Sequence, residues 1–258
     1  MFPNACYHFG QTVCLYPGCE GACMQYIPYL STLVTFAFTV SVFSRYLHRS
    51  APYLLIWAIG LFLYGIGTLS EVILGLTFSG IVLKLWYLCG AMLTAAWLGQ
   101  GSLHLLIRQR GVALTLTGAL AAVSILAAFL VLQYPLSQGV SAYRINQTIS
   151  SQYQSILTQS GLIIFLTILL NIYGTLALVG GALYSAYIFW RKHVLFNRMI
   201  GNILIAAGAF APAMGGTFIR IGLPDWMYVA ELIGVILMFI GFRQATIVQT
   251  VDAISTSR

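Results

Sequence analysis

Two oppositely charged residues lie thirteen positions apart in one of the most apolar parts of the sequence. Glu71 and Lys84 both fall within the stretch GTLSEVILGLTFSGIVLKLWYL, which runs from Gly67 to Leu88. A charge near the centre of a membrane costs about 2.5 kcal/mol or more, so such groups usually pair or face a polar site. The stretch therefore indicates an ion pair between helices, a ligand or proton site, or a long side chain that reaches back to the membrane surface.

Three further charges are expected at the same end of the molecule. Arg220 ends the sixth apolar run, Asp225 follows in a turn, and Glu231 lies near the start of the seventh run. The five residues Glu71, Lys84, Arg220, Asp225 and Glu231 are thus predicted to converge in the outer third of the protein. Two alternatives remain open: structural pairs of Glu71 with Lys84 and Glu231 with Arg220, or a ligand or proton site open to the outside.

A second group of polar residues lies inside the apolar runs, towards the inner side. These buried polar candidates are Gln100, His104, Asn171 and Asn202. Hydrogen bonds between helices account for most such residues in membranes. His104 is therefore interpreted as a hydrogen-bonded histidine rather than a metal or porphyrin ligand, and we predict no metal site and no cofactor.

Four cysteines stand close together before the first apolar run: Cys6, Cys14, Cys19 and Cys23. On the outer, oxidising side of a membrane, such cysteines favour disulfides. We expect residues 1-25 to form a small extracytoplasmic cap with two disulfides, for which three pairings are possible. A metal site is the alternative, although these spacings do not form paired C-x-x-C knuckles.

Long apolar runs recur along all 258 residues, and 60% of the residues are hydrophobic. A membrane-spanning helix needs roughly 20 mainly apolar residues, whereas barrel strands show shorter alternating patterns. The sequence predicts an all-α polytopic membrane protein whose transmembrane domain covers 26-248, followed by a cytoplasmic tail at 249-258. Seven spans are predicted, at about 27-47, 53-76, 81-107, 112-133, 159-190, 199-220 and 226-247.

The positions of the cations predict an orientation. With the N-terminus outside and the C-terminus inside, nine of the twelve Lys and Arg residues fall in inner loops and the tail. Inner loops of membrane proteins carry this excess of positive charge. The net charge of +7 is then explained by topology, and no nucleic-acid partner is predicted.

One part of the sequence resembles a known sensor family. It contains three segments: Trp57-Ala58-Ile59-Gly60 through Glu71, Lys84-Leu85-Trp86-Tyr87-Leu88, and Ala96-Trp97-Leu98. Together, over about 53-107, they resemble the seven-helix sensor region at the front of certain bacterial histidine kinases and diguanylate cyclases. The resemblance implies a sensor in a bacterial plasma membrane. Only sixteen residues follow Phe242, too few for a kinase or cyclase domain, so any output is expected to pass through a partner.

Three functions remain open from the sequence. No P-loop, H-E-x-x-H or G-x-S-x-G motif is present, and the seventh run has no lysine for a retinal. We favour a non-enzymatic sensor or accessory subunit that contacts another membrane protein within the lipid bilayer. The alternatives are a small-solute or proton-coupled transporter or channel that uses Glu71 and Glu231, and a membrane enzyme acting on lipid or quinone. The small-molecule ligand itself is not identified by the sequence.

Overall fold

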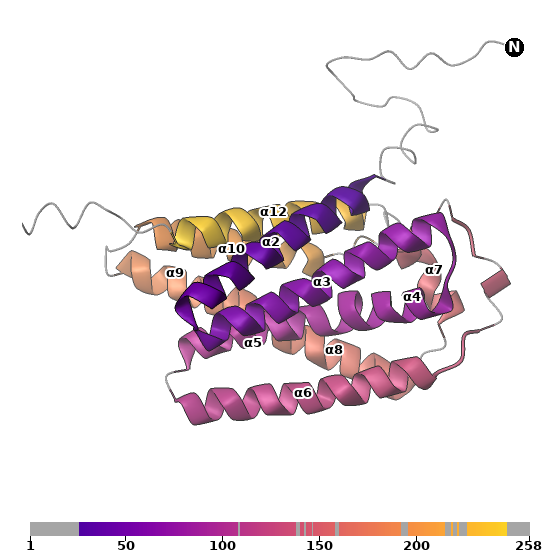
Figure 1. Cartoon of the computed structure of the whole chain (residues 1–258), viewed down its shortest axis with the longest axis horizontal. Helices are drawn as coiled ribbons and strands as arrows, with labels where there is room; N and C mark the ends of the chain where they lie inside the picture. The colour runs from indigo at the N-terminus through magenta and orange to yellow at the C-terminus, as the bar shows by residue number, and fades with distance from the viewer. Residues whose placement is uncertain are drawn as a thin grey trace, which may run out of the picture.

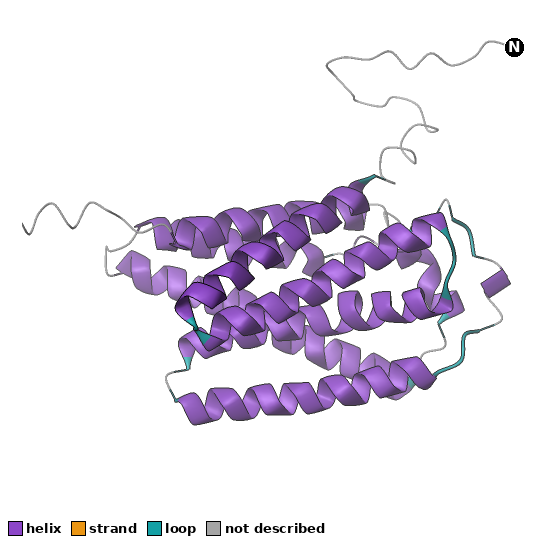
Figure 2. Cartoon of the chain, in the orientation of Figure 1, coloured by secondary structure: helices purple, strands orange, loops and turns teal. Residues whose placement is uncertain are grey.

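The protein is a bundle of helices, as a computed structural model shows (Figure 1). The structure describes residues 26–107, 109–137, 140–141, 143–145, 147–157, 160–191, 196–214, 218, 221 and 226–246, and at Arg110 and Ala213 only the backbone. Within these residues the regular structure is helical, with one isolated bridge between Leu136 and Leu157 (Figure 2). The predicted all-α class is confirmed for the described part of the chain.

Several helices follow one another without a break. The helices are α2 (Ile27–Arg49), α3 (Pro52–Leu76), α4 (Gly80–Leu85), η1 (Trp86–Leu93), α5 (Thr94–Leu106), α6 (Arg110–Gln133), α7 (Ile149–Ile156), α8 (Gly161–Thr175), η3 (Leu176–Gly180), α9 (Gly181–Arg191), α10 (Phe196–Ala213) and α12 (Trp226–Thr246). The elements η1 and η3 are π-helical. Each joins the α-helices before and after it into one long rod, so α4–η1–α5 and α8–η3–α9 act as single elements.

Six of these stretches are long and apolar enough to cross a membrane. They are Ile27–Arg49, Pro52–Leu76, Gly80–Leu106, Gly111–Gln133, Gly161–Arg191 and Trp226–Thr246. Their ends agree with the predicted spans to within two residues. The predicted sixth span, 199-220, is not among them, so the described residues support six candidate spans rather than seven. Its counterpart α10 has 18 residues and carries Asn197, Arg198 and Asn202 in its first half, which lowers its hydropathy.

The predicted cap and tail lie beyond the described residues. Cys6, Cys14, Cys19 and Cys23 all fall there, as do the residues from 247 onwards. The two predicted disulfides and the orientation of the termini therefore stay predictions.

The helices differ in how deeply they are packed. The largest contacts join α10 with α12, α2 with α3, and α3 with α5. In Figure 1, α2 and α12 lie along one side of the bundle and α6 along the other. Helix α6 keeps large apolar side chains exposed, among them Leu114 and Ile125, which are 69% and 72% exposed. Lipid tails are as apolar as these side chains, so this face suits contact with a bilayer.

Glycines bring α10 and α12 into backbone contact. Gly201 lies against Gly241, and Gly208 lies against Gly234. A Cβ added at Gly208 would be 2.5 Å from the carbonyl oxygen of Gly234, a distance that real Cβ atoms do not reach. Gly201 and Gly208 are seven residues apart on α10, as are Gly234 and Gly241 on α12. Seven residues make about two turns, so both glycines of a helix lie on the same face. Small residues of this kind allow membrane helices to approach closely.

The buried apolar side chains form two clusters rather than one core. One cluster, which includes Leu83, Met92 and Ile163, joins the first part of the α4–η1–α5 rod to α6, α7 and α8. The other, which includes Phe38 and Val235, joins α2, α3 and α5 to α10 and α12. Residues of both clusters line the cavity described below.

Candidate functional site

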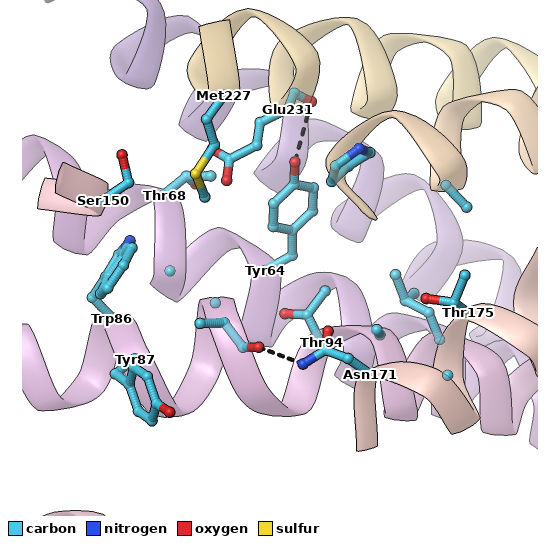
Figure 3. A pocket seen from close by; sticks show the side chains of 18 of the residues that line it. Tyr64, Thr68, Trp86, Tyr87, Thr94, Ser150, Asn171, Thr175, Met227 and Glu231 are labelled. Carbon is cyan, nitrogen blue, oxygen red and sulfur yellow. Dashed lines mark hydrogen bonds between the residues drawn. The ribbon is translucent and has the colours of Figure 1, made fainter. Parts of the chain in front are cut away.

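A cavity of about 370 Å³ lies inside the bundle, lined by residues of both apolar clusters (Figure 3). Trp86 and Tyr87 contribute from the first cluster, and Leu98 and Met238 from the second. Residues from α3, η1, α5, α7, α8, η3, α10 and α12 all reach it. Its size falls within the range of small-molecule pockets, roughly 300–1,000 Å³.

Both carboxyl side chains within the described helices line this one cavity. Glu71 comes from α3 and is 6% exposed, whereas Glu231 comes from α12 and is 7% exposed. They are 160 positions apart in the sequence, so only the packing of α3 and α12 brings them together. The predicted convergence of these two acids is found in the structure.

Three buried oxygen atoms of cavity-lining residues have no hydrogen-bond partner within the described residues. Among the described residues, five buried side-chain atoms lack one: Ser31 Oγ, Trp57 Nε1, Glu71 Oε2, Ser150 Oγ and Glu231 Oε2. The last three of these five belong to residues that line the cavity. Buried polar groups are nearly always satisfied, so such a concentration calls for an explanation.

The other oxygen of Glu71 is held by an indole. Trp86 Nε1 donates a hydrogen bond of 2.8 Å to Glu71 Oε1. The Trp86 ring is in turn tilted against the ring of Tyr153, with 5.4 Å between the ring centroids. Tyr153 also contacts Tyr87, whose hydroxyl shares a 2.9 Å hydrogen bond with Thr167. These aromatic contacts fix the carboxyl group of Glu71 at the cavity wall and leave Oε2 without a partner.

The backbone at Glu231 is fixed by a tyrosine from α3. The hydroxyl of Tyr64 donates a 3.1 Å hydrogen bond to the backbone carbonyl of Glu231, as Figure 3 shows. Tyr64 also lines the cavity and is 6% exposed. The contact fixes the position of α12 along the axis of α3, and so positions the Glu231 side chain.

Ser150 reaches the cavity from the short helix α7, which lies in the long connection after α6. Helix α7 is anchored by Ile149 and Ile156, which are 2% and 1% exposed. The side chain of Gln152 binds the backbone of Arg144 in the preceding loop. Gln152 Oε1 accepts a hydrogen bond from the Arg144 N–H, and Gln152 Nε2 donates one to the Arg144 carbonyl. The predicted loop 133–159 therefore folds inwards at this helix and supplies a wall of the cavity.

The π-helical turn η1 carries several cavity residues. Ala91 in this turn has its backbone carbonyl bound by Asn171 Nδ2 at 2.8 Å, and the same amide nitrogen also donates to the carbonyl of Thr167. Asn171 thus connects α8 to η1 beside the cavity, as Figure 3 shows for the bond to Ala91. Single π-helical turns inside α-helices are frequent at functional sites.

Two of the remaining inner polar residues, Gln100 and His104, form hydrogen bonds between helices. Gln100 is fully buried, and its Nε2 donates to the Ala113 carbonyl at 3.1 Å and to Thr117 Oγ1 at 2.8 Å. Tyr173 donates to Gln100 Oε1, and His104 Nε2 shares a 2.7 Å hydrogen bond with Thr117. Asn202 is partly buried on α10, away from the cavity lining. This arrangement agrees with the interpretation of His104 as a hydrogen-bonded histidine.

The predicted ion pair between Glu71 and Lys84 does not form. Lys84 Nζ instead donates a 2.8 Å hydrogen bond to the carbonyl of Leu132, in the last turn of α6. The last carbonyls of a helix have no partner within the helix, so they attract a nearby ammonium group. Arg220 and Asp225, the other members of the predicted cluster, lie outside the described residues.

The sequence reasoning missed Trp86, Ser150 and Tyr153 as site residues. A signal for α7 was present: Ile149, Tyr153 and Ile156 follow a helical spacing in an otherwise polar loop. Comparisons of the chain with protein families, curated proteins and solved structures find no match.

Proposed function

We propose that this protein is a non-enzymatic sensor located in the membrane. It binds a small solute in the cavity, and a partner membrane protein responds to whether the cavity is occupied. The supporting observation is that Glu71 Oε2, Glu231 Oε2 and Ser150 Oγ are buried at one cavity and have no hydrogen-bond partner in the described part of the chain. Leaving a buried polar group unsatisfied costs about 1–3 kcal/mol. A solute that supplies hydrogen bonds to these atoms would recover that cost when it binds.

The proposed architecture has seven spans, with α10 as the sixth, the N-terminus outside and the C-terminus inside. Two observations support it: the extensive packing of α10 along α12, and the excess of cations in the loops assigned to the inside. The cavity residues Glu71 and Ser150 would then lie towards the outer side. Labelling of single cysteines at Ser141→Cys and Ser255→Cys with an impermeant reagent tests the orientation, and exclusive labelling at 255 would contradict it.

A sensor role also agrees with the resemblance of residues 53-107 to bacterial seven-helix sensor regions. Glu71 and Trp86, which bind each other at the cavity, both belong to the resembling segment. Under this proposal the chain works in a bacterial plasma membrane and its output depends on a second protein. Cross-linking in the native membrane followed by purification should recover that protein in a fixed ratio.

Native mass spectrometry tests the binding function directly. The full chain, purified gently from its native membrane, should carry a small-molecule adduct. Ala91→Phe should reduce the adduct, because Ala91 lines the cavity and a phenyl group there would occupy part of its volume. Ala119→Phe on α6 is the matched control, since Ala119 is exposed and is not among the residues that line the cavity. An adduct not reduced by Ala91→Phe, or absent from the wild-type chain, would count against the proposal.

Proton-coupled transport is the second candidate function. It is favoured by the placement of the two carboxyl groups on different helices around one cavity. Pro212 lines the same cavity and interrupts the hydrogen bonding of α10. A transporter should move solute and protons together in proteoliposomes, and Glu231→Gln should abolish the coupling. A sensor should show no flux in the same vesicles.

A further inference from the structure

We propose that the solute bound in the cavity is a small organic cation, with an ammonium group attached to an apolar body. This inference rests on the proposed binding function and names the class of ligand. Glu71 and Glu231 both line the cavity, whereas no Lys, Arg or His among the described residues does. The cavity thus has two acidic groups and no described cation to neutralise them.

The three unpartnered oxygen atoms match the donors of an ammonium group. A primary ammonium group has three N–H donors and no acceptor. Glu71 Oε2 and Glu231 Oε2 are acceptors, and the hydroxyl of Ser150 can also accept. Hydrogen bonds between an ammonium group and carboxylates are about twice as strong as those between neutral groups. The buried oxygens and the ligand would therefore satisfy each other.

The rest of the lining suits an apolar or aromatic body. Trp86, which binds Glu71, and Tyr153, whose ring contacts Trp86, both line the cavity, and aromatic faces attract cations. Further along, Ala95, Leu98 and Leu178 present apolar side chains to the same cavity. An inorganic ion would leave this apolar part of a 370 Å³ space unused.

Matched pairs of probes test the charge requirement. Phenethylammonium is compared with 2-phenylethanol, and hexylammonium with 1-hexanol, on the full chain in detergent micelles, by calorimetric titration. We expect each ammonium compound to bind at least tenfold more tightly than its alcohol. Glu231→Gln and Glu71→Gln should each remove most of this preference. Asp252→Asn, the same carboxyl-to-amide change in the C-terminal segment, should retain it.

The outcomes separate the ligand class from the binding function. If each alcohol binds as tightly as its ammonium compound, the cation class is wrong and the binding function stands. If no ammonium compound binds although native mass spectrometry finds an adduct, the cation class is also wrong. If neither experiment finds binding, both proposals fail. Equal stabilisation by sodium or calcium chloride alone would identify an inorganic cation and overturn the organic class.

Discussion

The contact between α10 and α12 is tight enough that one added methyl group should measurably destabilise the protein. We expect Gly208→Ala to have this effect, because its Cβ would lie 2.5 Å from the Gly234 carbonyl oxygen and 2.8 Å from the backbone nitrogen of Met238. Ordinary contact begins at 3.4 Å, so the helices must separate by about 0.9 Å. Both neighbours are backbone atoms, which cannot move aside as a flexible side chain would.

The expected cost follows from overpacking, which typically amounts to about 1–3 kcal/mol. The matched control is Gly118→Ala in α6, where an added Cβ meets nothing within 4 Å. There the loss of a flexible glycine from a helix interior should stabilise the protein by about 0.5–1 kcal/mol. The two variants make the same chemical change, so opposite signs would isolate the effect of the helix contact.

The assay is thermal unfolding of the full chain in detergent, followed by tryptophan fluorescence. Each kcal/mol corresponds to about 2–4 °C for a chain of this size, so Gly208→Ala should melt several degrees below the wild type. The variant should also bind solute less tightly, because Ala209 and Pro212, adjacent in α10, line the cavity. A melting temperature for Gly208→Ala at or above that of the wild type, with Gly118→Ala stabilised, would refute the reasoning.

Three further changes test the hydrogen bonds at and around the site, each by melting temperature in detergent. Trp86→Phe leaves Glu71 Oε1 buried without its donor and should cost about 1–3 kcal/mol, whereas in a Glu71→Leu background it should cost much less; equal costs in both backgrounds would rule out the bond. Lys84→Met should cost under about 1 kcal/mol, since it loses only the bond to the Leu132 carbonyl, and its effect should add to that of Glu71→Gln. Strong non-additivity would revive the ion pair. Gln100→Leu should cost about 1–3 kcal/mol, because groups on two neighbouring helices lose their partner; an unchanged melting temperature would contradict this.

The helices were largely predictable because membrane insertion leaves a strong signal in the sequence. Helix α3 begins at Pro52, one residue before the predicted span 53-76, and proline is well tolerated in the first turn of a helix. Helix α10 was less predictable because Asn202 and the polar residues before it weaken the apolar signal. The π-helical turn η1 was not predictable, since the residues from Trp86 to Leu93 have the composition of an ordinary membrane helix.

The site was predictable only in part, because a sequence gives the depth of a residue in the membrane but not the direction in which it points. Glu71 and Glu231 were placed at similar depth, and the structure shows that they share a cavity. Lys84 was placed beside Glu71 for the same reason, yet it binds the end of α6. Ser150 was missed because its helix lies in a polar loop and gains its burial only from the surrounding bundle.

The glycine contacts between α10 and α12 also have a mechanical consequence. Backbone packed against backbone has no side-chain rotamers that could absorb a displacement, so the two helices should shift as one rigid lever. Glu231 lies near one end of this lever, and Thr246, 15 residues and about 22 Å further along α12, forms the other. There the carbonyl of Thr246 accepts a 3.4 Å hydrogen bond from Arg45 Nη2, near the end of α2. A small tilt caused at Glu231 would therefore emerge at the Arg45 contact, on the opposite end of the bundle.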